Sequence, residues 1–369
     1  TGNDVFNSLV GESSLHQDAS VAAVIKQRRR SVDSSDGGGM ENHRGGLARP
    51  SATVSDIPAI LRTVRSRPRD ERCTERAFQS LFLLATDPDP EGSVAREEIL
   101  ANGGMEALVS AIWDHMEHSR VLLALLHALW AISVFNGSGE GDDGKDSRVA
   151  ASIAKIRECG VLEGLLFSMQ SHAKDLNIQE SGCDLITRLT GLLPDETPEF
   201  KSAVVLLSSN MRGIDSNTKA YSSCLDALNS LCQLSDENKR EFAKAGNDCH
   251  SAIIRGLSTP SSGGVADGDS SPNLETRELA CQLFWCVTSD RTAVSILSST
   301  DGGLLSKNII DSLKNETPCA KSSVHFYGAA CGTLANLALD PDNHSKMIDL
   351  GAIPILCEAV YAYDFSEDV

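Results

Sequence analysis

The sequence predicts an all-α protein in which one helical segment is repeated and stacked into a solenoid. Three observations support this fold class. From residue 56 onward, apolar residues recur at i, i+3, i+4 spacing and hardly ever alternate with polar ones. One apolar stripe of this kind recurs six times along the chain. Aromatic residues make up only 5% of the 369 residues, so the core must consist mainly of aliphatic residues, Ala and Cys, which suits close helix packing.

Residues 1–55 are expected to form a disordered tail. They contain many turn-forming residues and few large apolar ones, so they cannot bury enough surface to offset the entropy of ordering. A basic cluster at Lys26–Arg30 is followed by Ser31. The cluster could be a nuclear-localisation signal, a kinase site at Ser31, an autoinhibitory ligand for the acidic remainder of the chain, or an unspecialised solvated run.

The net charge of −18 is unevenly distributed. Residues 1–86 carry a net charge of +2, which leaves −20 for the rest of the chain. A body this acidic repels nucleic acid and anionic lipid and favours basic protein partners, although solubility of a large helical surface would also explain it. We find no apolar run long enough for a membrane span, so we expect a soluble protein of the cytoplasm or nucleus. The eleven cysteines show no CxxC spacing and are interpreted as reduced, buried thiols.

The repeated segment is a helix with one apolar face. When six segments are aligned on a common final position, the residue before that position is aliphatic in every copy. Residues three and six positions earlier are apolar as well, which is the stripe of a buried helix face. The final positions are Ala85, Ser133, Thr190, Cys232, Thr288 and Ala338. They are 48, 57, 42, 56 and 50 residues apart, and the two longest steps contain Gly-rich stretches at 136–147 and 259–272 that we interpret as inserted loops.

The last copy is the most informative. It reads Ala329-Ala-Cys-Gly-Thr-Leu-Ala-Asn-Leu-Ala338, followed by a turn with Asn343 and then Gly351-Ala-Ile-Pro354. This pattern resembles the armadillo repeat, and weaker echoes occur at 99–109, 156–166, 238–254 and 300–305. The resemblance implies an armadillo/HEAT-type right-handed α-solenoid over residues 56–369, with about six repeats, the last one incomplete. The missing last helix suggests a fragment of a longer chain.

Each repeat should contain a short first helix, a second helix and a longer third helix. A glycine is expected wherever one helix must stop and the chain must turn sharply into the next. These glycines are Gly104, Gly160, Gly246, Gly303 and Gly351.

In the armadillo family, third helices line a concave groove that binds extended peptides. The resemblance therefore implies a non-catalytic protein–protein interaction scaffold that binds an extended basic segment of another protein. The candidate peptide-binding residues lie two and six positions before the final position of each third helix. They are Gln79, His127, Asp184, Arg188, Asp226, Ser230, Gln282 and Asn336.

Two alternative functions stay open. Nuclear-transport adaptors of the family carry Asn and Trp at these two positions, whereas only Asn336 matches here. We therefore do not expect this chain to recognise peptides in the way those adaptors do. The other alternative is a regulatory segment of a larger multidomain protein or enzyme.

Three motifs could carry other chemistry. Asp87–Glu98 matches much of an EF-hand calcium loop, although two prolines and a turn like the one at Asp340–Asp342 favour an inter-repeat turn. Gly139–Asp146 approaches a phosphate-binding loop but lacks the Ser or Thr that holds magnesium. His115 and His118 could chelate a metal, although the solvated end of a second helix is the simpler interpretation. No catalytic set can be assembled, so we expect neither an enzyme, nor a metal, nor a cofactor.

Overall fold

The computed structural model describes residues 52–87, 90–133, 153–258, 272–301, 303–315 and 324–364. All secondary structure in these ranges is helical, which confirms the predicted all-α class. The basic cluster at 26–30 and the expected loop at 136–147 lie outside the described residues. The expected loop at 259–272 ends at least one residue earlier, because a helix begins at Pro272. No helix of the described ranges is long and apolar enough to span a membrane.

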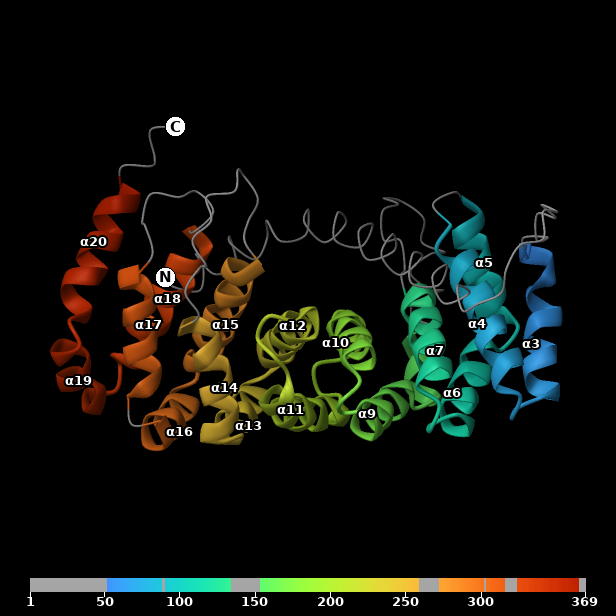
Figure 1. The fold of residues 1–369 in the computed structure, drawn as a ribbon, viewed down its shortest axis with the longest axis horizontal. Helices are drawn as coiled ribbons and strands as arrows, with labels where there is room; N and C mark the ends of the chain where they lie inside the picture. Colours follow the sequence, from blue (N-terminus) through green and yellow to red (C-terminus); the bar gives the residue numbers. More distant parts are fainter. Residues whose placement is uncertain are drawn as a thin grey trace, which may run out of the picture. The chain divides into compact units, whose positions relative to one another are not determined.

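The chain forms two compact units, residues 1–152 and 153–369, which are described separately. In the first unit, the long helices α4 and α7 pack side by side, and α3 packs against α4, α5 and α6 (Figure 1). Asp70 caps α4 by accepting a hydrogen bond from the backbone N–H of Cys73. The elements of this unit are η1 (Val54–Asp56), α3 (Ile57–Ser66), α4 (Glu71–Ala85), α5 (Pro90–Ala101), α6 (Gly104–Asp114) and α7 (Ser119–Ile132).

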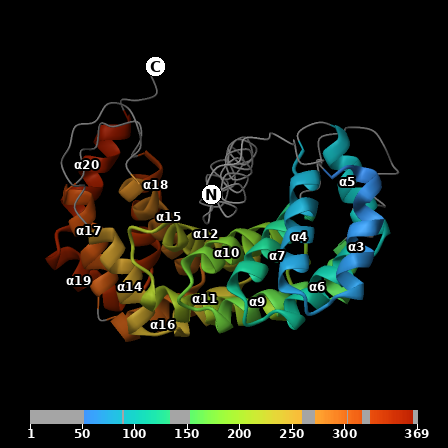
Figure 2. The ribbon, with the colours of Figure 1, turned by 45° about the vertical axis from the view of Figure 1, so that its right-hand side comes forward.

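In the second unit, four long helices form a row in which α10 packs against α12, α12 against α15, and α15 against α18 (Figure 1, Figure 2). The shorter helices follow the same order beside them, so that α9 contacts α11, α11 contacts α13, and α13 contacts α16. Residues 153–158 are helical, and the elements after them are α9 (Val161–Ser171), α10 (Leu176–Thr190), α11 (Pro198–Asn210), η2 (Met211–Gly213), α12 (Lys219–Leu234), α13 (Asp236–Lys244), α14 (Asn247–Ser258), α15 (Pro272–Thr288), α16 (Arg291–Asp301), α17 (Leu304–Asn315), α18 (Val324–Leu337), η4 (Pro341–Asn343), α19 (His344–Asp349) and α20 (Ala352–Asp364).

The predicted apolar stripe forms the core of both units. Its members are buried on all six long helices, apart from Leu84, Ala77 and Cys331, which are half-buried. Each fully buried Leu, Ile or Phe contributes about 1.5–3 kcal/mol relative to an exposed one, so the long helices supply much of the folding free energy.

The buried cysteines behave as small packing residues. Burial raises the pKa of Cys249 and that of Cys281 to about 12, so both thiols are neutral and unreactive at physiological pH. The prediction of free, buried thiols is confirmed for Cys183, Cys224, Cys232, Cys249, Cys281 and Cys286. Burial was wrongly predicted for the exposed Cys357 and is only partial for Cys73, Cys159 and Cys331.

The glycine turns are confirmed at four positions and corrected at one. Gly160, Gly246, Gly303 and Gly351 have φ between 65° and 95°, the left-handed region that disfavours side chains. In the first unit the left-handed residue is Gly103, with φ of 72°, rather than the predicted Gly104. Gly104 is already the first residue of α6, where an added Cβ would clash with Ile99, so it is needed for close packing instead.

The expected three-helix repeat is wrong for one copy. Only residues 191–197 separate α10 from α11, and Pro198 is the first residue of α11. A separate first helix therefore has no room to form. The repeat ending in α12 therefore contains only two full helices. Nor is the first helix always short: α5 has 12 residues and α6 has 11.

In each of two repeats, a buried asparagine hydrogen-bonds in the same way to the end of the long helix before it. Asn238 and Asn343 lie just after α12 and α18, and the Nδ2 of each donates to a carbonyl of the preceding long helix, Leu231 at 2.8 Å and Leu337 at 2.9 Å. Both asparagines are at most 4% exposed. They satisfy carbonyl groups at helix C-termini that would otherwise lack donors.

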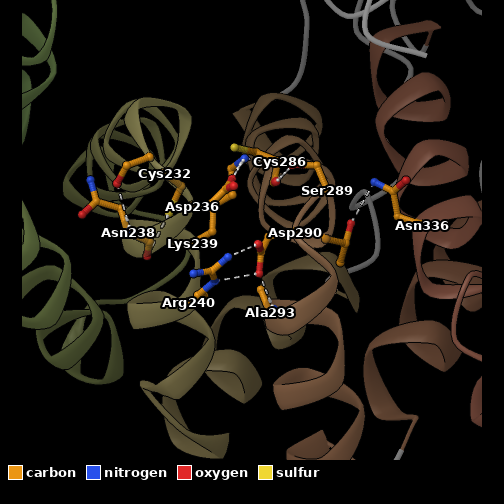
Figure 3. A network of polar contacts seen from close by, with 12 residues as sticks. Cys232, Asp236, Asn238, Lys239, Arg240, Cys286, Ser289, Asp290, Ala293 and Asn336 are labelled. Carbon is orange, nitrogen blue, oxygen red and sulfur yellow. Dashed lines mark hydrogen bonds and ion pairs between the residues drawn. The ribbon is translucent and has the colours of Figure 1, made fainter. Parts of the chain in front are cut away.

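Neighbouring repeats of the second unit are also joined by charged contacts (Figure 3). Arg240 of α13 donates two hydrogen bonds to Asp290, at 3.1 and 2.8 Å, and Asp290 in turn accepts from the backbone N–H of Ala293 at the start of α16. Lys239 donates to the Ser289 hydroxyl at 3.0 Å. Residues 50 positions apart in the sequence thus hold two successive repeats together.

Candidate functional site

The predicted site residues of the second unit lie on the row of long helices. Asp184 and Arg188 belong to α10, Asp226 and Ser230 to α12, Gln282 to α15 and Asn336 to α18, and all six are half-buried. A spacing of four residues places each pair on one side of its helix. The row therefore brings together residues that are 152 positions apart in the sequence.

The first unit holds the other two predicted residues. Gln79 of α4 is half-buried, whereas His127 of α7 is only 6% exposed. The imidazole of His127 packs against Phe82 of α4, with 5.7 Å between ring centroids. His127 is therefore mainly a packing residue and presents little surface to a ligand.

Asp226 is the electrostatic centre of the second unit's row. Burial raises its pKa to about 6, and repulsion from Asp184 and Glu275 adds to the shift, while the nearby hydroxyl of Thr187 acts in the opposite direction. Among the described residues, no cationic side chain forms an ion pair with Asp226 or Glu275. Glu275 was not predicted, although it lies two helical turns before Gln282 on the same side of α15.

A half-buried carboxylate, Glu278, lies on the same helix as Glu275. Burial raises the pKa of Glu278, and repulsion from Glu275 adds to this, while His325 of α18 counteracts it. Gln282 donates from Nε2 to Glu278 Oε1 at 2.9 Å, so its amide group is already engaged within α15.

Asn336 is engaged as well. Its Nδ2 lies 3.4 Å from the carbonyl oxygen of Trp285 and 3.3 Å from the Thr288 hydroxyl oxygen, so it donates across to the end of α15 (Figure 3). Its amide nitrogen therefore helps to join two long helices in this structure. The resemblance to the armadillo family predicted that Asn336 contacts a bound peptide.

A regular relation between neighbouring long helices was missed from the sequence. Counted from the final positions of the six aligned segments, the residue at three positions before one final position lies against the residue at six positions before the next final position. Phe82 contacts His127 in this way, and Trp285 covers Gly332. The hydroxyl of Thr187 influences Asp226 through the same relation. The environment of each residue six positions before a final position thus depends on the preceding long helix, which the pattern of a single helix does not reveal.

The first unit also contains a surface hollow of about 440 Å³ between the N-terminal halves of α4 and α7. Its lining contains three arginines and three glutamates, whose charges balance. Arg120 donates to Glu75 at 3.0 Å, and His118 Nε2 lies 2.9 Å from Glu71 Oε1. The hollow therefore lacks the uncompensated charge found around Asp226. Its lining residues are Glu71, Arg72, Glu75, Arg76, Gln79, Glu117, His118, Ser119, Arg120 and Val121.

The alternative motifs find little support. Residues 90–101 form α5, so Asp87–Glu98 cannot wrap a cation as a calcium loop does. His115 is 1% exposed, with Nε2 hydrogen-bonded to Thr74 at 3.2 Å, so the expected solvated helix end is wrong there. Within the described ranges, no group of three or more His, Cys, Asp or Glu side chains could hold a metal ion. Gly139–Asp146 lies outside those ranges.

Comparisons with known proteins bear on the fold alone. No protein-family model and no curated protein matches the sequence. The structure is similar to the crystal structure of an engineered protein from the Northeast Structural Genomics Consortium, with a TM-score of 0.53 at 18% identity, covering 77% of this chain and 96% of that one. A second engineered protein from the same consortium gives a TM-score of 0.47 at 16% identity, covering 83% of this chain and 84% of that one. The first match supports an all-helical, repeat-like fold.

Proposed function

We propose that this chain is a non-catalytic interaction scaffold that binds an extended, basic segment of another protein along the row α10, α12, α15 and α18. The observation that carries the proposal is the environment of Asp226. This half-buried carboxylate faces Asp184 and Glu275, and no cation pairs with it among the described residues. A basic ligand would relieve this repulsion, whereas an acidic one would increase it.

We further propose that the repeats are of the armadillo type and wind into a right-handed solenoid. The left-handed glycine turns and the asparagines that cap α12 and α18 support this assignment. The two-helix repeat that ends in α12 is closer to the HEAT pattern, and the two repeat types are compatible in one array. A scaffold of this kind would act in the cytoplasm or nucleus.

A nuclear-transport adaptor is a weaker proposal. Asn336 is the only asparagine at its position among the six copies, and its Nδ2 donates to α15. Gly332 stands where that family's peptide-binding tryptophan would be expected. No observation favours a regulatory role within an enzyme.

Fluorescence anisotropy with labelled twelve-residue peptides tests the proposed function. The full chain should bind a lysine-rich peptide in 0.15 M salt, and it should not bind a serine-rich peptide of the same length. Replacing two carboxylates of the row, Asp184→Asn with Glu278→Gln, should weaken binding about ten-fold or more.

A matched control removes the same two kinds of charge elsewhere in the second unit. Asp195→Asn with Glu163→Gln changes exposed residues of the turn before α11 and of α9, and should leave the affinity within about two-fold because their charges are solvated. Equal weakening by both double variants would mean that net charge, and not the row, attracts the peptide. That result, or binding of the serine-rich peptide with similar affinity, would contradict the proposal.

A further inference from the structure

Arginines cluster at the end of α3 and in the turn that leads to α4. Residues 57–69 contain four arginines and no acidic residue, a net charge of +4 in a chain whose net charge is −18. All four arginines are exposed. We call Arg62, Arg65, Arg67 and Arg69 the arginine corner. It belongs to the first unit and contains no residue of the long helices.

The positive charge of the arginine corner is not neutralised by the described part of the chain. Within that part, the side chains of Arg62, Arg67 and Arg69 form neither an ion pair nor a hydrogen bond. Arg65 donates to the backbone carbonyl of Gly103 at 2.8 Å, a neutral acceptor, so its charge is also uncompensated. The next carboxylate along the chain, Asp70, accepts from the backbone N–H of Cys73 at the start of α4. Three guanidinium groups therefore keep all their N–H donors for an external anion.

The backbone that carries these arginines is held in one conformation. The N–H of Arg67 donates to the carbonyls of Thr63 and Val64 at 3.2 and 3.1 Å, and its own carbonyl accepts from the N–H of Asp70 at 3.1 Å. Pro68 has a fixed φ and stiffens the same turn. A ligand of the arginine corner would thus have to order side chains only, which lowers the entropic cost of binding.

We propose that the arginine corner binds an acidic segment of another protein. A guanidinium group matches a carboxylate with two parallel hydrogen bonds, and the corner contains no lysine. The Cα atoms of Arg62 and Arg69 are at most about 20 Å apart, which corresponds to about six extended residues. This inference goes beyond the proposed function, because it gives the first unit a ligand of the opposite charge and does not depend on the row of the second unit.

A polypeptide fits the arginine corner better than a nucleic acid does. Single-stranded nucleic acids are held by aromatic rings on which bases stack, whereas the only aromatic residues among 52–87, Phe78 and Phe82, are fully buried. A long phosphodiester chain would also extend beyond the four arginines onto a strongly acidic protein. A second copy of this chain is disfavoured as well, since two molecules of net charge −18 repel each other.

Fluorescence anisotropy with a labelled twelve-residue glutamate-rich peptide tests the proposal on the full chain. The peptide should bind in 0.15 M salt, and raising the salt to 0.5 M should weaken it about ten-fold, because the contacts are exposed and charged. A twelve-nucleotide oligothymidine should bind at least ten-fold more weakly than the peptide.

A triple variant and a matched control locate the binding. Arg62→Gln, Arg67→Gln and Arg69→Gln together should weaken the glutamate-rich peptide about ten-fold or more. These side chains are exposed and make no contact that the fold requires, so the variant should fold, which circular dichroism verifies. Arg157→Gln, Lys174→Gln and Arg291→Gln remove three exposed positive charges of the second unit and should change the affinity less than two-fold.

The outcomes that overturn the proposal are distinct. Absence of binding, equal weakening by both triple variants, or tighter binding of the oligothymidine would each contradict it. Sedimentation of the full chain alone should give the same mass for wild type and the Arg62, Arg67 and Arg69 variant. Self-association that this variant loses would assign the arginine corner to a second copy instead.

The two proposed ligands can fail separately. Asp184→Asn with Glu278→Gln should leave the affinity for the glutamate-rich peptide within about two-fold. A chain that binds this peptide but not the lysine-rich one would contradict the proposed function and leave the arginine corner standing, and the reverse result would do the opposite.

Discussion

The indole of Trp285 in α15 lies against Gly332 of α18, so closely that a Cβ added at position 332 would come within 2.4 Å of the indole Nε1. The glycine is therefore required by a side chain of the neighbouring repeat. Gly328, one turn earlier on the same helix, has open space around its Cα. These two glycines provide a matched pair for testing how α15 and α18 are held together.

Gly332→Ala should destabilise the chain by about 1–3 kcal/mol, because the added methyl group must displace a large, rigid side chain. Gly328→Ala should instead be neutral or stabilise by up to about 1 kcal/mol, since alanine favours the helix and meets no neighbour. The free energy of unfolding in urea measures both effects. Combining Gly332→Ala with Trp285→Ala should cost less than the sum of the two single variants, and strict additivity would disprove the contact.

The helices could be predicted from the sequence because their signal is local. The apolar stripe that ends at Leu231 and Leu337 is a property of one helix face, and both residues are buried as expected. The two-helix repeat was missed because the alignment covered only the long helices, although Pro194 and Pro198 in the short connection to α11 argued against a further helix. Which of Gly103 and Gly104 adopts the left-handed conformation depends on which of them packs against Ile99, and a sequence pattern does not contain that contact.

The site was less predictable, since its chemistry arises between helices. Asp226 could be placed by its position in the repeat, whereas its repulsion from Glu275 depends on the offset between α12 and α15. Trp285 was not among the residues chosen by family resemblance, yet it lies against Gly332 of the neighbouring helix. His127 occupies the predicted position and is nevertheless buried, because Phe82 of the preceding helix packs against it.

Asp290 should contribute more to stability than its partner Arg240. Asp290 is buried and caps α16 in addition to pairing with Arg240, whose side chain is 42% exposed. We expect Asp290→Ala to cost about 2 kcal/mol and Arg240→Met about 1 kcal/mol or less, as measured by urea unfolding at pH 7. Asp290→Asn keeps the capping oxygen, so its cost in free energy of unfolding should lie between those of Asp290→Ala and Arg240→Met.

The pH dependence of this pair has a definite sign. Hydrogen bonding from Arg240 lowers the pKa of Asp290 below its usual 3.8, so the stabilisation is present above pH 4 and is lost as the pH falls further. The difference in free energy of unfolding between wild type and Asp290→Ala should therefore become smaller in acid. A difference that grew below pH 4 would contradict the assignment.

Asp226→Asn should stabilise the chain at neutral pH. The folded-state pKa of about 6 lies above the usual 3.8, so the folded state holds a proton that the unfolded state has already released between these values. Wild-type stability from this group is therefore lost as the pH rises from about 4 to 6. The increase in free energy of unfolding that Asp226→Asn gives over wild type should grow from near zero below pH 4 to roughly 2–3 kcal/mol above pH 6.5. Urea unfolding at several pH values measures it, and Asp195→Asn should show no such trend.

Binding of the lysine-rich peptide should weaken in acid for the same reason. Asp184 and Glu275 face Asp226 from the two neighbouring helices, and together they favour its protonation near pH 6. At pH 5 only about a tenth of Asp226 is ionised, so a binding row that needs this carboxylate should bind the peptide about ten-fold less tightly than at pH 7.5. Lysine stays charged throughout this range, so the change in affinity must come from the protein.

Anisotropy titrations should show that Asp226→Asn binds more weakly at pH 7.5 and loses most of the pH dependence. A variant that kept the full ten-fold change would place the titrating group elsewhere on the row.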